Sequence, residues 1–165
     1  MKIVLRLALL AVVIAAGVWL WNVFFPSSET VIRRHLNSVA ADASFDSKQN
    51  PLVAANNAET LAGFFATNVQ INLDVPGHAQ QSFASRGEIT QAALAARSVV
   101  GGLKVEFLDV DVAVGADKLS ATADLTVKAQ AAREKDVIVQ EMKFTFQKID
   151  GDWLITRVET VRTLS

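Results

Sequence analysis

The sequence predicts an α+β domain that follows an apolar N-terminal segment. In the first half of the chain, apolar residues recur at the spacing of an amphipathic helix. In the second half, long segments alternate between apolar and polar residues, as half-buried strands do. The dipeptide Asp150-Gly151, a strong signal for a tight hairpin turn, separates the last two of these segments. Helices followed by such a run of strands are typical of the α+β class.

The composition excludes several classes of function. The 165 residues are 51% hydrophobic and contain no cysteine, so disulfides, thiolate metal ligands and cysteine nucleophiles are excluded. Lys2 and Arg6 are the only charged residues before Glu29, so all 17 acidic residues lie in the rest of the chain, which is net acidic. This charge balance argues against a nucleic-acid partner. The two histidines, His35 and His78, are far apart in the sequence, and we expect neither a metal nor a cofactor.

Residues 7–25 form an apolar segment that is long enough to cross a membrane. As a helix, this segment measures about 28 Å, close to the hydrocarbon thickness of a bilayer. Trp19 and Trp21 lie near its outer end, where indole rings favour the headgroup boundary. We therefore expect residues 1–26 to be a retained signal anchor, a single transmembrane helix, and residues 27–165 to form the folded domain.

A cleaved signal peptide is the alternative for the same segment. Lys2 and Arg6 form a basic start, and Ala15-Ala16-Gly17 is a small-residue site that a signal peptidase could accept. Cleavage there would leave apolar residues at the new N-terminus, which favours the retained anchor. Positive charge before the span predicts an N-terminus inside the cell, with the C-terminal domain in the periplasm or outside the cell.

The first helix is predicted to begin near Ser28, with this residue or the preceding serine as N-cap and Glu29 in the first turn. Its apolar face consists of Val31, Ile32, His35, Leu36 and Val39. Residues 42–50 are polar and are predicted to form a turn. Pro51 predicts the start of a second helix, and residues 58–65 a short third one.

The remaining elements are a strand pair, a helix and several long strands. Residues 69–75 alternate as a strand, and residues 80–85 are its short partner after the Pro76-Gly77 turn. A helix from Gly87–Ser98 then presents a face of small residues, formed by Ile89, Ala92, Ala93 and Ala96. The long strands are predicted at residues 103–114, 119–129, 137–148 and 153–164.

A β-bulge is predicted in the strand at residues 103–114. The apolar residues of its first half, Leu103, Val105 and Phe107, have the opposite parity to those of its second half, Leu108, Val110, Val112 and Val114. One extra residue near Phe107-Leu108 would bring both halves to the same face and would bend the strand. A bent sheet wrapped over helices leaves a conical cavity.

Two segments resemble a known family. Ser85-Arg86-Gly87-Glu88-Ile89 and the segment from Phe144 to Ile155 resemble the helix start and the final hairpin of the nuclear transport factor 2-like (NTF2-like, or SnoaL-like) superfamily. The resemblance covers about residues 29–164. It implies a cone-shaped NTF2-like, cystatin-like fold, in which a bent antiparallel sheet packs on N-terminal helices. It implies no particular function, because this fold hosts isomerases, cyclases, dehydratases and inert scaffolds.

His35 is the sharpest candidate for chemistry. It lies on the apolar face of the first predicted helix, so we expect it to face the cone, where a neutral imidazole could act as a general base. The alternative is a core or rim histidine that bonds one backbone carbonyl. The isomerase site of the superfamily, an aspartate base with a tyrosine-containing oxyanion hole, cannot be copied here because the chain has no tyrosine.

Three aspartates and one arginine are weaker candidates. Asp74, Asp109 and Asp111 are expected on solvated strand faces, because their parity is opposite to that of the buried residues. Arg86, just before the predicted helix, could bind an anion together with free backbone N–H groups, or could pair with an acid.

Five residues are predicted to line the cone as a ligand site: His35, Phe64, Gln140, Met142 and Phe144. Gln140 shares the parity of Met142 and Phe144, so its amide would project among apolar groups. A buried amide needs hydrogen-bond partners, so it could orient a ligand or bond a backbone group or His35. The aromatic residues are equally compatible with an ordinary core.

Two functions from different classes remain. In the first, a non-catalytic, membrane-tethered domain binds a partner protein or a small apolar ligand in its cone, in an envelope assembly or accessory role. In the alternative, a small acid–base enzyme of isomerase, cyclase or dehydratase type uses His35 as its base. An enzyme needs several titratable groups in one pocket, and the pattern supplies only His35, which favours the binding function. A homodimer through the sheet is a further prediction.

Overall fold

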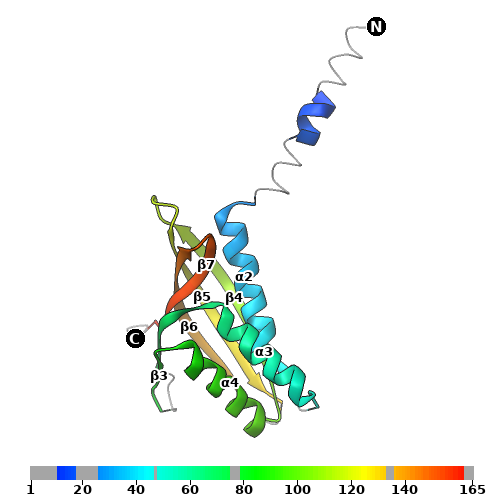
Figure 1. Cartoon of the computed structure of the whole chain (residues 1–165), viewed down its shortest axis with the longest axis vertical. Coiled ribbons are helices and arrows are strands. Elements are labelled where there is room, and N and C mark those ends of the chain that lie inside the picture. The colour runs from blue at the N-terminus through cyan, green and yellow to red at the C-terminus, as the bar shows by residue number, and fades with distance from the viewer. Residues whose placement is uncertain (1–10, 18–25, 47, 75–78, 133–135, 162–165) are drawn as a thin grey trace.

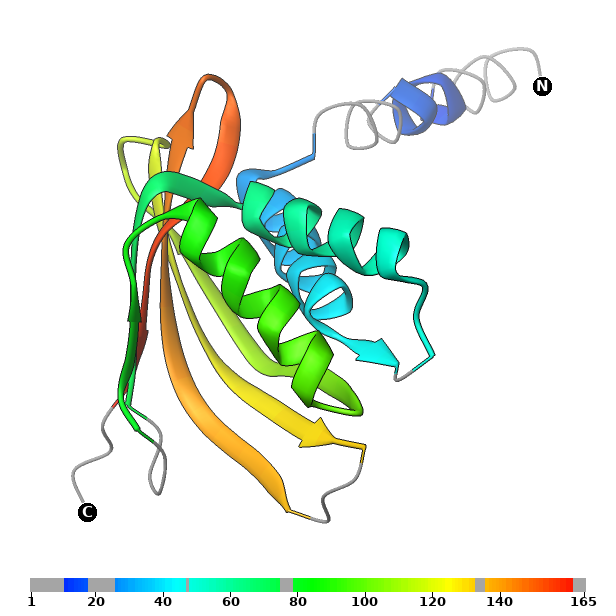
Figure 2. The ribbon, with the colours of Figure 1, turned by 60° about the horizontal axis from the view of Figure 1, so that its bottom comes forward.

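Three helices lie on one face of a curved, seven-stranded sheet (Figure 1; Figure 2). This computed structural model describes residues 11–17, 26–46, 48–74, 79–132 and 136–161. The helices are α2 (Ser28–Ala43), α3 (Pro51–Gly63) and α4 (Arg86–Val99). The strands are β1 (Phe45–Asp46), β2 (Phe65–Leu73), β3 (Gln81–Phe83), β4 (Gly102–Val114), β5 (Ser120–Ala131), β6 (Val137–Ile149) and β7 (Asp152–Thr160), in the spatial order β1-β4-β5-β6-β7-β2-β3. The predicted α+β class is confirmed.

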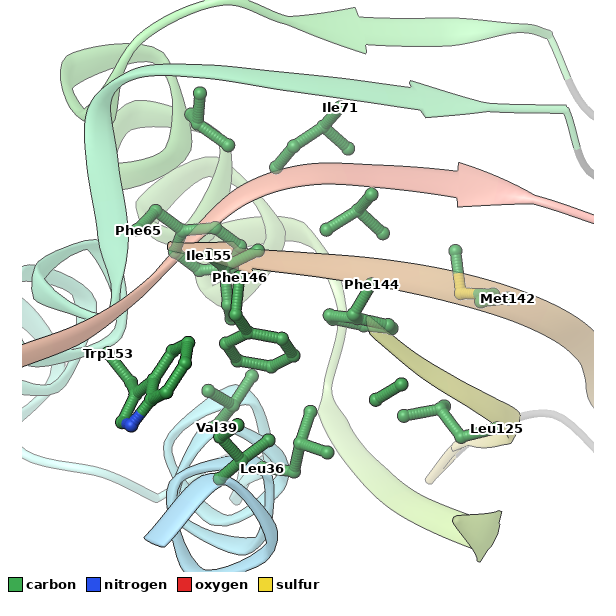
Figure 3. Close-up of a cluster of buried hydrophobic side chains, with 14 of the residues drawn as sticks. Leu36, Val39, Phe65, Ile71, Leu125, Met142, Phe144, Phe146, Trp153 and Ile155 are labelled. Atoms are coloured by element: carbon green, nitrogen blue, oxygen red, sulfur yellow. The ribbon is translucent and has the colours of Figure 1, made fainter. Parts of the chain in front are cut away.

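The core lies between α2 and the middle of the sheet. Ser27 is the N-cap of α2, and its side chain accepts a hydrogen bond from the backbone N–H of Thr30. Ile32 and Leu36 are fully buried on the inner face of this helix. Figure 3 shows Phe144, Phe146 and Ile155 projecting from β6 and β7 into the same cluster as Leu36 and Val39. The apolar face that the sequence predicts for this helix therefore forms one side of the core.

The predicted bulge and the predicted hairpin turn are both present. The pairing of β4 with β5 shifts between Leu108 and Asp111, where Asp109 has a φ of 51°. Leu108 is exposed and Val110 packs against the core, so the extra residue follows Leu108 rather than preceding it. At the β6–β7 turn, Asp150 and Gly151 have φ values of 53° and 96°, as a tight hairpin turn requires.

Some sequence predictions need correction. Residues 51–63 form one continuous helix, not two, because no glycine or proline lies between Pro51 and Gly63. The next strand begins at Phe65, inside the segment predicted as a third helix. This strand, β2, pairs with β7 in parallel, so the sheet is mixed rather than wholly antiparallel. The two-residue strand β1 pairs with β4 in a segment that was predicted to be only a turn.

Most of the predicted membrane anchor lies outside the described residues, as do His78 and the Pro76-Gly77 turn. Residues 11–17 are helical, and all their side chains are exposed. Within the described parts of the chain, no helix is both long enough and apolar enough to span a bilayer.

The outer face of the sheet is polar. Lys143 approaches Asp124 at 3.4 Å, and Lys128 approaches Glu106 at 3.5 Å, with all four side chains substantially exposed. Exposed ion pairs of this kind contribute little to stability, in general less than about 1 kcal/mol each. The homodimer through this face stays a prediction.

Candidate ligand cavity

His35 is half-buried and lies beside two aromatic rings. Its imidazole meets the ring of Phe64 edge-on at a centroid distance of 4.7 Å and that of Phe146 at 6.0 Å. It bonds the backbone of Phe64, whose carbonyl oxygen also accepts a hydrogen bond from the N–H of Ile155 at 3.0 Å. The histidine therefore links α2 to the start of β2, next to β7. This is the role of a core or rim histidine that bonds one backbone carbonyl.

The surroundings of His35 favour its neutral form. Burial lowers the pKa of His35, while the backbone hydrogen bond to Phe64 and the charge of Asp152 act in the opposite direction. The Nε2 atom is shielded from solvent and has no hydrogen-bond partner. A general base must exchange a proton with its substrate through one of its ring nitrogens. No hydrogen-bonding group contacts Nε2 of His35.

The five residues predicted to line one ligand site have different surroundings in the structure. His35 and Phe64 are in contact, whereas Phe144 packs against the ring of Phe107 at 5.7 Å in the core. Met142 is buried in the middle of β6, opposite Leu125 of β5. The Gln140 amide donates to the backbone carbonyl of Val161 at 3.3 Å.

The weaker candidates have structural partners or are solvated. The Arg86 Nε–H donates to the backbone carbonyl of Phe65, so this side chain ties the start of α4 to the start of β2. Asp109 and Asp111 are exposed, as expected from their parity. The backbone N–H of Asp74 donates to the hydroxyl of Thr160.

The described structure contains an apolar cavity of about 210 Å³ beneath α4, which we call the α4 cavity. It lies between α4 and strands β2 and β3, and it reaches the last turn of α2, β1 and the start of β4. Its lining residues are Ala43, Phe45, Leu61, Ile71, Leu73, Phe83, Ile89, Ala92, Ala93, Ala96, Arg97 and Leu103. All of them except Arg97 are apolar.

Small residues on α4 create this space. Ser85 caps the helix by accepting a hydrogen bond from the N–H of Glu88, which fixes where the helix begins. Ile89 is the only residue of α4 that is buried. The next residues on the same face are the alanines Ala92, Ala93 and Ala96, which line the cavity. The sequence predicts this face, but as a surface for close packing rather than as the wall of a cavity.

Arg97 lies at the edge of the α4 cavity, and sequence analysis missed it. Its Nη1 donates to the carbonyl of Ala93 at 3.2 Å, and its Nη2 donates to the carbonyl of Asp42 at 2.6 Å. The guanidinium carbon lies 5.1 Å from the centre of the Phe45 ring, which is cation–π geometry. Its Nε–H is buried without a partner, a state that costs roughly 1–3 kcal/mol.

Arg97 and Asp42 are both partly desolvated. Burial lowers the pKa of Arg97 and raises that of Asp42, while the attraction between the two groups opposes both shifts. Arg97 also stands in the last turn of α4, where a cation is favourable, and it serves the end of α2, whose last turn has no basic residue.

A larger hollow of about 790 Å³ lies beside β1, the start of β4 and the end of β5. Several of its lining side chains are exposed and polar, including Asp46, Lys48, Lys104 and Gln130. It is therefore a solvated surface depression, whereas the smaller α4 cavity offers apolar contacts. Among the described residues, no cluster of three or more metal-ligating side chains is present.

Comparisons with known proteins show the fold. No family model matches the chain, and no curated protein matches its sequence. The structure resembles a cystatin-like domain of unknown function from Nostoc punctiforme, with a TM-score of 0.61 and 18% identity over 85% of this chain and 80% of the other. It resembles an NTF2-like protein of unknown function from Pseudomonas putida at a TM-score of 0.60 and 12% identity, over 84% and 90% of the two chains.

A third similar structure is a protein of Novosphingobium aromaticivorans that is provisionally described as a scytalone dehydratase. Its TM-score is 0.57 and its identity 16%, over 81% of this chain and 84% of the other. Identities this low establish a common fold and carry no activity across. The described domain therefore has the NTF2-like, cystatin-like fold that the resemblance implies.

Proposed function

We propose that this domain is a non-catalytic binding module that holds one small, largely apolar ligand in the α4 cavity. The observation that carries the proposal is the lining, in which eleven apolar residues surround a space with one charged side chain at its edge. Sites for small molecules are concave and mostly apolar, with a few polar groups that fix the orientation of the ligand.

The volume supports a small occupant. At about 210 Å³, the α4 cavity lies below the range of roughly 300–1,000 Å³ that is typical of drug-sized ligands. It equals about seven times the share of one water molecule in the liquid, roughly 30 Å³. The ligand that fits it therefore has on the order of ten non-hydrogen atoms or fewer in the buried part.

The position of His35 supports binding rather than acid–base catalysis. This histidine is absent from the α4 cavity lining, and it contacts aromatic rings and one backbone group, while the charge of Asp152 acts on it at longer range. Proton transfer in a pocket needs at least two groups in reach of the ligand, a base and a group that stabilises developing charge. The α4 cavity offers Arg97 alone.

We also propose that residues 7–25 tether this module to a membrane, with the domain on the periplasmic or external side. The apolar run and the basic residues before it support this arrangement. Intact-mass measurement on protein extracted from membranes is expected to show a chain that begins at Met1 or Lys2. A chain that begins near Val18 would contradict the tether.

A series of neutral alkanols from four to ten carbons tests the ligand proposal. Each buried methylene contributes about 0.8 kcal/mol, or about fourfold in affinity. We expect the affinity of the full-length chain, measured by ligand-observed NMR, to rise along the series. It is expected to stop rising at about six to eight carbons, when the chain fills the available volume.

Two alanines on α4 provide a matched pair of variants. Ala93 lines the α4 cavity, whereas Ala95 is exposed on the same helix. The variant A93L is expected to weaken binding of the best alkanol at least tenfold, and A95L to leave it unchanged. An affinity that keeps rising to ten carbons, with no difference between these variants, would indicate non-specific adsorption and would contradict the proposal.

A further inference from the structure

Arg97 is the one charged residue in the lining of the α4 cavity. Two of its five N–H donors are used by backbone carbonyls, those of Ala93 and Asp42. The Nε–H is shielded from solvent and has no acceptor. The guanidinium group therefore stands at the edge of an apolar space with donors that the protein does not use.

The charge of Arg97 is not neutralised by a contacting carboxylate. None of the ion pairs between described residues includes this arginine. Asp42 contributes its backbone oxygen to the guanidinium and acts on it with its carboxylate only at longer range. A partly desolvated cation, with a shielded Nε–H and no contacting anion, favours a ligand that brings one.

The surroundings hold the guanidinium in place. It lies over the Phe45 ring and is bonded to the carbonyls of Asp42 in α2 and Ala93 in α4, so its orientation is set before any ligand arrives. A planar guanidinium matches the two oxygens of a carboxylate, and a single cation balances a single negative charge.

We propose that the ligand of the α4 cavity is an apolar monocarboxylate, whose hydrocarbon part fills the cavity while its carboxylate binds Arg97. This inference rests on the proposed function and specifies the chemical class of its ligand. The neutral wall of alanines, leucines and phenylalanines accepts the hydrocarbon part, and the arginine at the edge selects the head group.

Octanoate and 1-octanol form the pair of probes that tests this inference. They share a hydrocarbon chain and differ in charge at neutral pH. We expect the full-length chain to bind octanoate about tenfold more tightly than 1-octanol, because hydrogen bonds to charged groups are roughly twice as strong as neutral ones. The variant R97Q is expected to remove this advantage, so that octanoate and 1-octanol bind with similar affinity.

Two further variants test whether the octanoate advantage comes from the geometry of Arg97 or only from positive charge on the protein. The variant R97K is expected to retain part of the advantage, because lysine keeps the charge and loses the planar pair of donors. Arg34 is exposed on α2, so R34Q removes the same charge elsewhere and is expected to change neither affinity. If R97Q does not fold, the wild-type chain still supplies a test. The octanoate advantage should shrink as salt is raised from about 50 to 500 mM.

The outcomes distinguish the two proposals. Equal binding of octanoate and 1-octanol, with 1-octanol still excluded by A93L, overturns the carboxylate inference and leaves the proposed function standing. An octanoate advantage that survives both R97Q and high salt also overturns the inference. If neither probe binds, both proposals fail.

Discussion

Helices α2 and α4 both face the sheet, but α2 presents large side chains to it and α4 presents mainly small ones. On α2, Ile32 and Leu36 are fully buried and belong to the same core cluster as the aromatic residues of β6. Figure 3 shows Leu36 in this cluster. On α4, Ile89 alone is buried, and the alanines that follow leave about 210 Å³ unfilled. The comparison teaches that large side chains make one helix a structural support, whereas small ones leave the other as the wall of a binding site.

The largest expected effect is on the α2 side. Truncation of fully buried Leu36 to alanine is expected to lower the free energy of unfolding by about 3–5 kcal/mol, because it removes core contacts and leaves a void. Chemical denaturation measures this change. The matched variant on α4, L94A, removes a 40% exposed side chain and is expected to cost less than about 1 kcal/mol. Equal losses of unfolding free energy in L36A and L94A would contradict the difference between α2 and α4.

A second substitution, at Gly151, lies outside both helices. Its cost in stability is a reference for the changes measured in the helix variants. Gly151 has a φ of 96°, and a Cβ added there would meet nothing within 4 Å, so the cost of a side chain is entirely that of the backbone. The variant G151V is expected to lower the free energy of unfolding by about 1–3 kcal/mol. Asparagine tolerates this backbone region, so G151N should lose less. Neither variant should alter 1-octanol affinity, and a change in that affinity would show that the turn and the α4 cavity are coupled.

A third pair compares enlargement on the two helices. Ala40 is buried on α2, and A40L is expected to cost about 1–3 kcal/mol because that side is already filled. Ala93 borders the α4 cavity, and A93L is expected to stabilise the protein by about 0.5–2 kcal/mol because the added atoms occupy an existing space. Thermal or chemical unfolding checks the sign. A loss in A93L as large as in A40L would mean that the α4 side has no room.

The smallest expected effect is a pH dependence that comes from the α2 side. Burial lowers the pKa of His35 in the folded chain, so the unfolded chain binds the proton more readily. Stability is therefore expected to fall as the pH drops from about 7.5 through the unfolded pKa near 6.5, and to level off below the folded pKa. The variant H35Q should show a flatter slope over this window, while R97Q should keep the wild-type slope. An unchanged slope in H35Q would show that His35 is not the group responsible.

The sequence predicts most of the architecture but not the location of the cavity. The stripe of α2, the bulge near Leu108 and the turn at Asp150-Gly151 follow from local patterns, and the structure confirms all three. The parallel pairing of β2 with β7 does not follow, because a strand's own residues do not identify its neighbour. The sequence of α4 shows a face of small residues. Whether this face packs closely or borders a cavity depends on the distance between α4 and the elements that it faces, which the sequence pattern does not give.

The functional residues show the same division. The helical spacing places His35 correctly on an inner face, but its contacts with Phe64 and Phe146 depend on the position of β2 and β6. Arg97 has an ordinary place in the last turn of a helix, and only the tertiary structure brings the end of α2 and the Phe45 ring to it. Contacts between distant segments, rather than residue type, decide which of these side chains faces an empty space.

The most direct test of the account is amide hydrogen exchange in the full-length chain, with and without saturating 1-octanol. Without ligand, the amides of α4 are expected to exchange faster than those of α2, because α4 has few buried contacts. With ligand, protection should rise more in α4 than in α2, since the ligand supplies the contacts that the alanines leave unmade. Protection that rises equally in both helices, or in neither, would contradict a ligand site beneath α4.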